Sequence, residues 1–378
     1  MSGNSQVRTT AVLCFLCVIA LTVAFPVQAQ AQPQAETPDA VVSPGESIQD
    51  AIETASPGET IQLNSGTYEQ GIVIDKNLNI VASGDVTLNG AGVSAEDGIV
   101  VETTNVTIDG IEITQFSDDG IDVRGNNLDP RQIEIVNVTS RLNDGYNIVI
   151  FSSQAEDTVE LTNVVSRNSN PNPNDDGGDD ADGIEIAAET VTVEETTVID
   201  SEDTGLEIFA GKEGTVNIQD STFANNGVFA DGDAFGEEFN EDGISIASAQ
   251  DVSIKNTTVI NSKQNGIEIL GSDAIAGGRT VNLTNVTARA NGFDGAFISG
   301  TTDSDTVSIA NSQFNQNDDE GLNVVVESVN IAQTNLTRNT LAGARVGGAF
   351  TGGTLTQSSI FNNGGPAILN AVSGTSVD

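Results

Sequence analysis

Short segments in which apolar and polar residues alternate recur along most of the chain after residue 60. Three of them read VTIDGIEITQFSDDGIDV from Val106, VSIKNTTVINSKQNGIEI from Val252 and VSIANSQFNQNDDEGLNV from Val307. Each contains a Val-x-Ile strand, a polar turn, a second short strand, another polar turn and a third strand that a glycine opens. Such a two-residue period is typical of strands that bury one face. The pattern therefore predicts three short strands per repeat and no long helix.

The glycines that open the third strand measure the length of the repeat. Most neighbours lie 22 to 29 residues apart and two pairs lie 38 apart, at Gly98, Gly120, Gly145, Gly183, Gly205, Gly243, Gly266, Gly295, Gly321 and Gly343. A short period with three strands per repeat is typical of a parallel solenoid. We therefore expect one all-β domain, a parallel β-helix with roughly 22–29 residues per coil, over residues 61–372.

A second column of residues supports this register. The position four residues after the start of each coil holds mostly Asn, including Asn137, Asn163, Asn256 and Asn285. Amides stacked from coil to coil can hydrogen-bond to one another at a turn. We expect this ladder to face inward.

The segments on either side of the solenoid have different patterns. Residues 43–60 contain Ile48, Ala51, Ile52 and Ala55 on one helical face, behind Ser47 as a candidate helix cap. We expect a short amphipathic helix that covers the first open sheet edge, where unpaired backbone is a liability. Residues 32–42 are predicted to be a linker and residues 373–378 a tail.

The first 31 residues indicate export. Residues 11–25, AVLCFLCVIALTVAF, form an apolar run after Arg8, and Ala29-Gln30-Ala31 offers a small-residue cleavage site. Residues 1–31 are therefore predicted to be a signal peptide, although an uncleaved anchor is an alternative. We expect a secreted or cell-surface protein, periplasmic if the organism has two membranes, without a membrane span after cleavage.

Composition narrows the chemistry. The chain has no His, and after removal of the signal peptide it has no Cys and no Met. Imidazole and thiolate catalysis and the usual zinc and copper ligands are thereby excluded, whereas oxygen-binding cations such as Ca²⁺ remain. The net charge of -42 argues against nucleic acid as a partner. Abundant acids with little lysine also suggest a halophilic source.

The repeats and the segment before them carry a family resemblance. The repeats resemble the right-handed parallel β-helix of the pectin-lyase-like superfamily, and SIQDAIETASPGETIQLNSGTYEQGIVIDKNLNIVASG resembles the first coil of such proteins. This opening is especially similar to the group related to periplasmic copper-protein accessory factors. The resemblance implies the right-handed fold, and a polysaccharide or cell-envelope glycan as partner. A copper role does not follow, because the soft ligands are absent, and the Gly-His-Gly and Arg-Ile-Lys motifs of polygalacturonases are missing.

The two long spacings predict where a site lies. Insertions at residues 169–182 and 227–242 leave the solenoid at the same turn, two coils apart. The outward column of the glycine-opened strand is predicted to include Asn147, Glu185, Glu207, Ser245 and Glu268. Of these, Glu185, Glu207 and Ser245 would form the floor of a cleft between the insertions. A polar column just before the glycines is predicted to include Asp119, Asp144, Asp182 and Asp242. If the protein is an enzyme, we expect its catalytic residues to be Glu185, Glu207, Asp182, Asp242 and Lys212.

Three interpretations compete for the acidic residues. The insertions could bind Ca²⁺ through Asp175, Asp176, Asp179, Asp180, Asp231 and Asp233. Stacked Glu185 and Glu207 could instead split their pKa values and serve a glycosidase, or a polysaccharide lyase could use Lys212 with Ca²⁺. The acids could also form only a solvated surface. We therefore expect a secreted carbohydrate-active or carbohydrate-binding β-helix, with a non-catalytic surface protein as the alternative.

Overall fold

The computed structural model describes residues 37–124, 130–151, 156–170, 181–227, 241–271, 278–300, 304–347 and 352–370. The predicted signal peptide, the predicted tail and residues 32–36 lie outside these ranges. The predicted linker ends early, because Ala40–Val42 form strand β1 and pair with Ile61–Leu63. Within the described residues, no helix is long and apolar enough to cross a bilayer.

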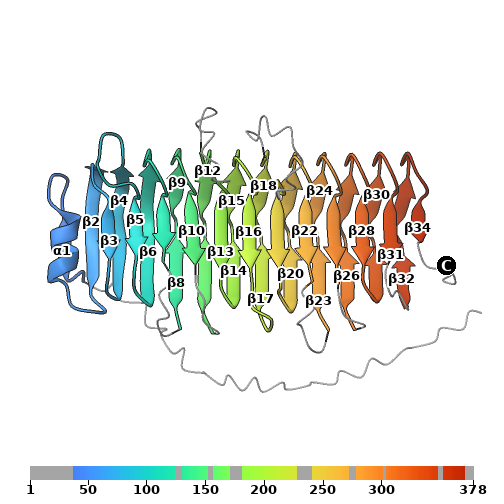
Figure 1. The fold of residues 1–378 in the computed structure, drawn as a ribbon, viewed down its shortest axis with the longest axis horizontal. Helices are drawn as coiled ribbons and strands as arrows, with labels where there is room; N and C mark the ends of the chain where they lie inside the picture. Colours follow the sequence, from blue (N-terminus) through green and yellow to red (C-terminus); the bar gives the residue numbers. More distant parts are fainter. Residues whose placement is uncertain are drawn as a thin grey trace, which may run out of the picture. The chain divides into compact units, whose positions relative to one another are not determined.

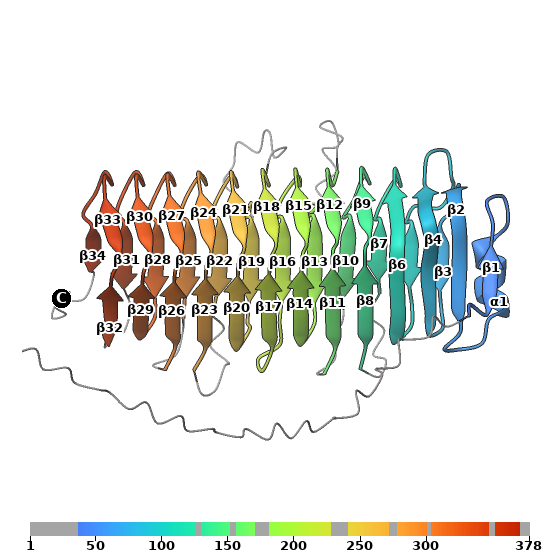
Figure 2. The same ribbon diagram turned by 180° about the vertical axis from the view of Figure 1, so that it is seen from behind.

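Residues 38–370 form a parallel β-helix built from two sheets (Figures 1 and 2). Sheet B has twelve strands that stack in chain order. They are β3 (Ile72–Ile74), β5 (Ile99–Val101), β7 (Ile121–Val123), β10 (Ile148–Phe151), β13 (Ile184–Ala187), β16 (Leu206–Phe209), β19 (Ile244–Ala247), β22 (Ile267–Leu270), β25 (Ala296–Ser299), β28 (Leu322–Val325), β31 (Ala344–Gly347) and β34 (Ile368–Asn370).

Sheet A has 22 strands and bends between two rows. Four strands start it: β1 (Ala40–Val42), β2 (Thr60–Tyr68), β4 (Leu78–Asn89) and β6 (Asn105–Thr114). The first row continues with β8 (Gln132–Val136), β11 (Thr158–Thr162), β14 (Thr190–Glu194), β17 (Thr215–Gln219), β20 (Asp251–Lys255), β23 (Thr280–Thr284), β26 (Thr306–Ala310), β29 (Ser328–Ala332) and β32 (Gly352–Thr356). The second row is β9 (Thr139–Arg141), β12 (Val165–Arg167), β15 (Thr197–Ile199), β18 (Thr222–Ala224), β21 (Thr258–Ile260), β24 (Thr287–Arg289), β27 (Gln313–Asn315), β30 (Asn335–Thr337) and β33 (Ser359–Phe361).

The only helix in the described residues, α1 (Ile48–Thr54), precedes β2. The Ser47 hydroxyl accepts a hydrogen bond from the Asp50 amide at 3.0 Å, which satisfies one of the free N–H groups at the helix start. Ile48 and Ile52 are completely buried and join the core. Figure 1 shows α1 at the first end of the stack.

The core follows directly from the alternation in the sequence. In sheet B, alternate positions point inward, so Ile186, Ile208, Ile246 and Ile269 stack from coil to coil with none of their surface exposed. Most coils contribute such residues from all three strand positions, whereas β9 and β12 point Ser140 and Ser166 inward. Stacking of like aliphatic side chains on neighbouring coils therefore produces one continuous core.

The predicted asparagine ladder is present, but its inward orientation is wrong. Asn163 donates to Asn137 at 2.8 Å and Asn285 donates to Asn256 at 2.9 Å, as stacked amides should. These residues have φ angles of 50° to 56° and their side chains are exposed. Asn tolerates this left-handed conformation, and the bend that it makes turns the side chain outward.

A second, buried polar column was not predicted. It follows the turn after the second row of sheet A and includes Asn143, Asn226, Asn291, Asn317 and Asn339, each at most 2% exposed. The Asn317 side-chain oxygen accepts from the Asn291 backbone amide at 3.2 Å, and Asn339 accepts from Asn317 at 3.1 Å. This ladder satisfies turn amides that would otherwise be buried without partners.

Two arginines are also buried, each 2% exposed. The Arg279 guanidinium donates to the carbonyls of Leu270 at 2.6 Å and Ser299 at 3.2 Å, and it lies beside the buried Asp305, one coil along. Arg131 repeats the arrangement with the carbonyl of Arg124 and with Asp157. Each arginine thus links the end of one strand of sheet B to the start of the strand of sheet A that follows it in the chain.

Candidate functional site

Both insertions replace the same turn of the solenoid. One connects β12 to β13 and the other connects β18 to β19, while β15 to β16 forms the uninterrupted turn between them. Asp182 and Asp242 stand at the ends of the insertions, just before sheet B begins again. The predicted calcium ligands Asp175, Asp176, Asp179, Asp180, Asp231 and Asp233 lie outside the described residues.

The outward column of sheet B places the predicted glutamates side by side. Glu185 pairs in register with Glu207, Glu207 with Ser245, and Ser245 with Glu268. The predicted adjacency of Glu185 and Glu207 is therefore confirmed. The column contains Val149 rather than the predicted Asn147, because Val149 is the residue that pairs with Glu185.

A shift of two residues explains that error. The strand-opening position of β10 is held by Asn147 rather than by Gly145, since β10 begins at Ile148. The same shift replaces the predicted Asp144 with Tyr146 in the polar column before the strands. The Ile-Val-Ile run at 148–150, aligned with Ile-Glu-Ile at 184–186, was the signal that could have located both residues.

Asp182, Glu185 and Glu207 come together. Each offers a carboxylate oxygen, and these oxygens all lie within 4.8 Å of one another. Asp182 and Glu185 are only 2% and 7% exposed although Glu185 lies on the outer side of the sheet. The Tyr146 hydroxyl donates a hydrogen bond to the Glu185 carboxylate. We call these four residues the carboxylate site.

Burial changes the acidity of this site. It raises the pKa of Glu185 to about 7, with the Glu207 charge adding to the effect and the Tyr146 hydrogen bond opposing it. Burial also raises the pKa of Asp182 well above its usual range, and the carboxylates of Asp203, Glu207 and Glu185 raise it further. Buried like charges disfavour simultaneous ionisation. The site therefore holds protons at neutral pH.

The column that contains Asp182 also has a structural role. One Asp182 oxygen accepts from the Thr204 amide at 3.0 Å, and one Asp242 oxygen accepts from the Asn265 amide at 2.7 Å. Asp294 accepts likewise from Glu320 at 2.8 Å. Each acid thus ties its own coil to the next. The second oxygen of Asp242 is buried and has no hydrogen-bond partner among the described residues.

The remaining predicted catalytic residues lie elsewhere. Asp242 is two register steps from Asp182, and burial, followed by the Glu268 charge, raises its pKa well above the usual range. Lys212 is exposed in the turn after β16, beyond the opposite end of that strand from the acidic column. The structure thus brings together three of the five predicted residues. It adds Tyr146 and, two coils along, Glu268, whose pKa burial raises.

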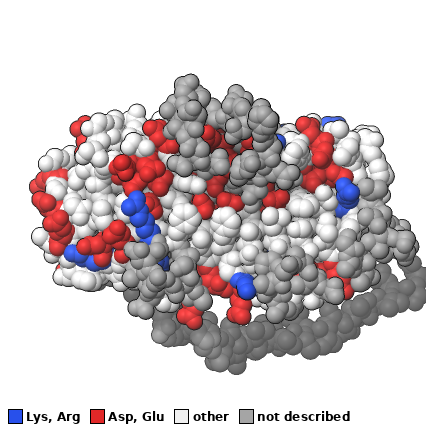
Figure 3. All heavy atoms as spheres, viewed as in Figure 1, with Lys and Arg blue, Asp and Glu red and all other residues white. Residues whose placement is uncertain are grey.

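Two further groups of acids lie along the same edge. Asp97, Asp118 and Asp119 form one, where burial raises the pKa of Asp119 to about 8, and Arg124 bridges Asp97 and Asp122. Asp294, Asp319 and Glu320 form the other, where burial raises the pKa of Asp294 to about 7. Figure 3 shows the acidic side chains along this band and a largely uncharged band beside it.

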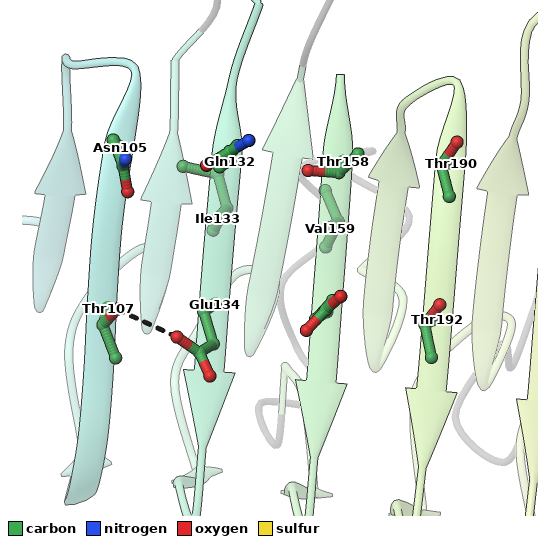
Figure 4. A pocket seen from close by; sticks show the side chains of 10 residues that line it. Asn105, Thr107, Gln132, Ile133, Glu134, Thr158, Val159, Thr190 and Thr192 are labelled. Carbon is green, nitrogen blue, oxygen red and sulfur yellow. Dashed lines mark hydrogen bonds between the residues drawn. The ribbon is translucent and has the colours of Figure 1, made fainter. Parts of the chain in front are cut away.

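A separate hollow lies on sheet A. It is a groove of about 390 Å³ over β6, β8, β11 and β14, lined mainly by Thr, Gln, Asn and Glu side chains (Figure 4). Glu134 pairs in register with Glu160, and Glu134 accepts a hydrogen bond from the Thr107 hydroxyl at 3.0 Å. We call this surface the threonine groove. None of the predicted site residues lies in it.

Comparisons with known proteins agree on the fold. Residues 236–378 match the family described as "Right handed beta helix region". Pectate lyase Pel9A is 18% identical with a TM-score of 0.53, over 79% of each chain. The A-module of mannuronan C-5 epimerase AlgE4 from Azotobacter vinelandii is 13% identical with a TM-score of 0.55, over 89% of this chain and all (100%) of that one.

A third similar structure is the catalytic domain of a GH87 α-1,3-glucanase in complex with tetrasaccharides, 16% identical with a TM-score of 0.51 over 90% of this chain and 67% of that one. No curated protein sequence matches the chain. At these identities the likeness concerns the fold alone. The predicted fold is thereby confirmed: the chain folds as a right-handed parallel β-helix.

Proposed function

We propose that this chain is a carbohydrate-active protein that cleaves a glycan at the carboxylate site by retaining glycoside hydrolysis. The observation that carries the proposal is the pairing of the buried Glu185 with the partly buried Glu207, which are register neighbours with carboxylate oxygens within 4.8 Å. Retaining glycosidases place two carboxyl groups about 5–5.5 Å apart, and inverting enzymes need roughly 6.5–9.5 Å to admit a water. The short separation supports the retaining mechanism.

The raised pKa of Glu185 assigns the roles. Protonated Glu185 donates its proton to the glycosidic oxygen as that oxygen leaves, while ionised Glu207 attacks the anomeric carbon. Water then attacks the anomeric carbon, Glu185 takes the proton from that water, and the bond to Glu207 breaks. Tyr146 orients Glu185 through its hydroxyl, and the charges of Glu207 and Glu185 help to raise the pKa of Asp182.

A lyase has less support. Proton abstraction beside a uronate needs a basic residue close to the site, and Lys212 lies beyond the other end of β16. The three carboxylates have the donor chemistry of a Ca²⁺ site, so bound Ca²⁺ would hold them ionised and inhibit the hydrolytic reaction. A calcium titration of turnover distinguishes these alternatives.

One observation favours the non-catalytic alternative. Acids that accept backbone amides of the next coil recur at Asp97, Asp182, Asp242 and Asp294, so the column has a structural role along much of the solenoid. A glycan-binding surface protein would need only this scaffold. Retained glycan binding without turnover, on every polysaccharide tested, would establish this alternative.

We also propose that the chain is exported and that α1 caps the first end of the β-helix. Secretion is supported by the apolar run at residues 11–25 after Arg8 and by the small-residue cleavage site at Ala29-Gln30-Ala31. The capping role of α1 is supported by the burial of Ile48 and Ile52 against the first coils. Deletion of residues 43–55 would expose that end, and loss of soluble monomer would support the capping role.

The decisive experiment compares Glu185→Gln and Glu207→Gln with Glu134→Gln, a matched exposed glutamate in the threonine groove. Reducing-end release and the anomeric configuration of the first product should be measured on a polysaccharide panel. The proposal expects release with retention by the wild type and by the control, and loss of release in both site variants. Inversion, or equal activity in all variants, would contradict it.

A further inference from the structure

A row of apolar side chains runs beside the carboxylate site on the outer face of sheet B. It consists of the last residues of five consecutive strands, which pair in register in the order Phe151, Ala187, Phe209, Ala247 and Leu270. Large and small side chains alternate along it. We call this the phenylalanine row.

Both rings are open to solvent. Phe151 is 47% exposed and Phe209 is 43% exposed, whereas Phe116, Phe223 and Phe314 are buried in the core with at most 1% exposed. Exposed aromatic side chains grouped on one face mark an interaction surface more often than scattered single ones do. The alanine between the rings leaves each ring face accessible from the side.

The spacing of the rings follows from the register. Phe151 and Phe209 are separated by two steps between strands, which is about 9.6 Å. Leu270 continues the row after two more steps. A linear ligand of repeating units that lies across the strands would therefore meet an apolar contact at every second strand.

Polar groups lie directly beside this row. Glu207 precedes Phe209 by two residues and Glu185 precedes Ala187 by two, so each pair points to the same side of the sheet. A pyranose ring offers an apolar face of C–H groups and a rim of hydroxyls. Aromatic rings pack against the former and carboxylates accept hydrogen bonds from the latter.

The negative charge beside the phenylalanine row favours an uncharged ligand. Asp182, Glu185 and Glu207 are clustered here in a chain of net charge -42. A polyuronate or other polyanion would bring further negative charge to a buried acidic cluster, at a large electrostatic cost. An uncharged sugar chain carries no such cost.

We propose that Phe151 and Phe209 form a stacking platform for an uncharged polysaccharide, which lies across the strands of sheet B beside Glu185 and Glu207. This inference rests on the proposed function and names its substrate class. It also assigns the direction of the chain, parallel to the axis of the β-helix.

The test measures binding separately from turnover. The full protein should be titrated by calorimetry with cellohexaose and laminarihexaose as uncharged probes and with hexagalacturonate as the anionic probe of equal length. Phe151→Ala and Phe209→Ala are each expected to weaken binding of the best uncharged probe by roughly three- to tenfold, and the double variant by more. Phe209→Tyr, which keeps the ring, should restore binding.

The matched control is Phe361→Ala, because Phe361 is 55% exposed on β33 of sheet A. This control should bind as the wild type does, and unchanged melting temperatures would show that the variants fold. The platform would be overturned if no uncharged probe bound or if hexagalacturonate bound more tightly than the uncharged probes. Unchanged affinity in the double variant would also overturn it. Bound but uncleaved probe, with Phe209→Ala still weakening it, would refute only hydrolysis.

Discussion

Two pairs of glutamates on different faces of the β-helix invite comparison. Glu185 and Glu207 on sheet B, and Glu134 and Glu160 on sheet A, are each direct register neighbours on adjacent parallel strands. The first pair lies in a cluster where Glu185 is only 7% exposed, whereas the second is exposed in the threonine groove. The two pairs are therefore equally adjacent in register, but they differ in burial. Burial, rather than proximity, gives the carboxylate site its raised pKa and its proposed chemistry.

The largest expected effect is a difference in activity between variants of the two glutamate pairs. Removal of the general acid in Glu185→Gln should lower kcat by about 10²- to 10⁴-fold, and Glu207→Gln should lower it at least as much. Glu134→Gln and Glu160→Gln should leave kcat within about twofold, since both side chains contact solvent. Initial rates at saturating substrate would measure this, and comparable losses for both pairs would remove the distinction.

The same contrast between buried and exposed charge applies to stability. Arg279→Met removes the buried guanidinium that donates to the carbonyls of Leu270 and Ser299 and that lies beside the Asp305 charge, so the free energy of unfolding should fall by about 3–5 kcal/mol. Arg141→Met breaks an exposed ion pair with Glu112, whose atoms are 2.6 Å apart, and should cost less than about 1 kcal/mol. Urea denaturation would compare them, and equal losses would refute the importance of burial.

The buried ladder and the exposed face of sheet A offer a third comparison. Asn317→Ala leaves the Asn291 amide without its acceptor in the interior, which should lower the free energy of unfolding by about 1–3 kcal/mol. Ser308→Ala on the exposed face of β26 should change it by less than about 0.5 kcal/mol. A larger loss for the serine, measured by the same denaturation, would contradict this account.

The dependence of stability on pH tests the buried carboxyls without changing their side chains. Burial raises the folded-state pKa of Glu185 and Asp294 to about 7 and of Asp119 to about 8. The folded state then binds more protons than the unfolded state above the ordinary carboxyl pKa near about 4, so stability decreases as pH rises. We expect the melting temperature to fall between pH 4 and pH 8. Glu185→Gln should flatten part of that slope and Glu134→Gln should not, and a melting temperature that rises over this window would contradict the assignment.

The sequence predicted those features that repeat. Alternation and the glycine period were sufficient for the solenoid, its core and the adjacency of Glu185 and Glu207, because each coil restates the same pattern. Features that break the repeat were harder to predict from the sequence. Asn147 and Tyr146 were missed since one coil opens its strand without glycine, which displaced the alignment by two residues.

The orientation and burial of polar side chains could not be read from spacing. The ladder at Asn137 and Asn163 is exposed because left-handed turn residues point outward, and the inward ladder at Asn291 and Asn317 carries the same residue type. Arg279 was likewise unexpected, since a buried guanidinium depends on an aspartate one coil away. The role of the insertions stays a prediction, because the proposed calcium ligands lie outside the described residues.

The most direct test of the central claim is a titration of individual glutamate carboxyls, by NMR of protein labelled with ¹³C at the glutamate side-chain carbonyl. We expect one carboxyl that titrates near pH 7, that disappears in Glu185→Gln and that persists in Glu134→Gln and Glu160→Gln. If the signal lost in Glu185→Gln titrates near about pH 4, as an unperturbed carboxyl does, burial does not hold a proton at the carboxylate site, and the proposed acid catalysis fails.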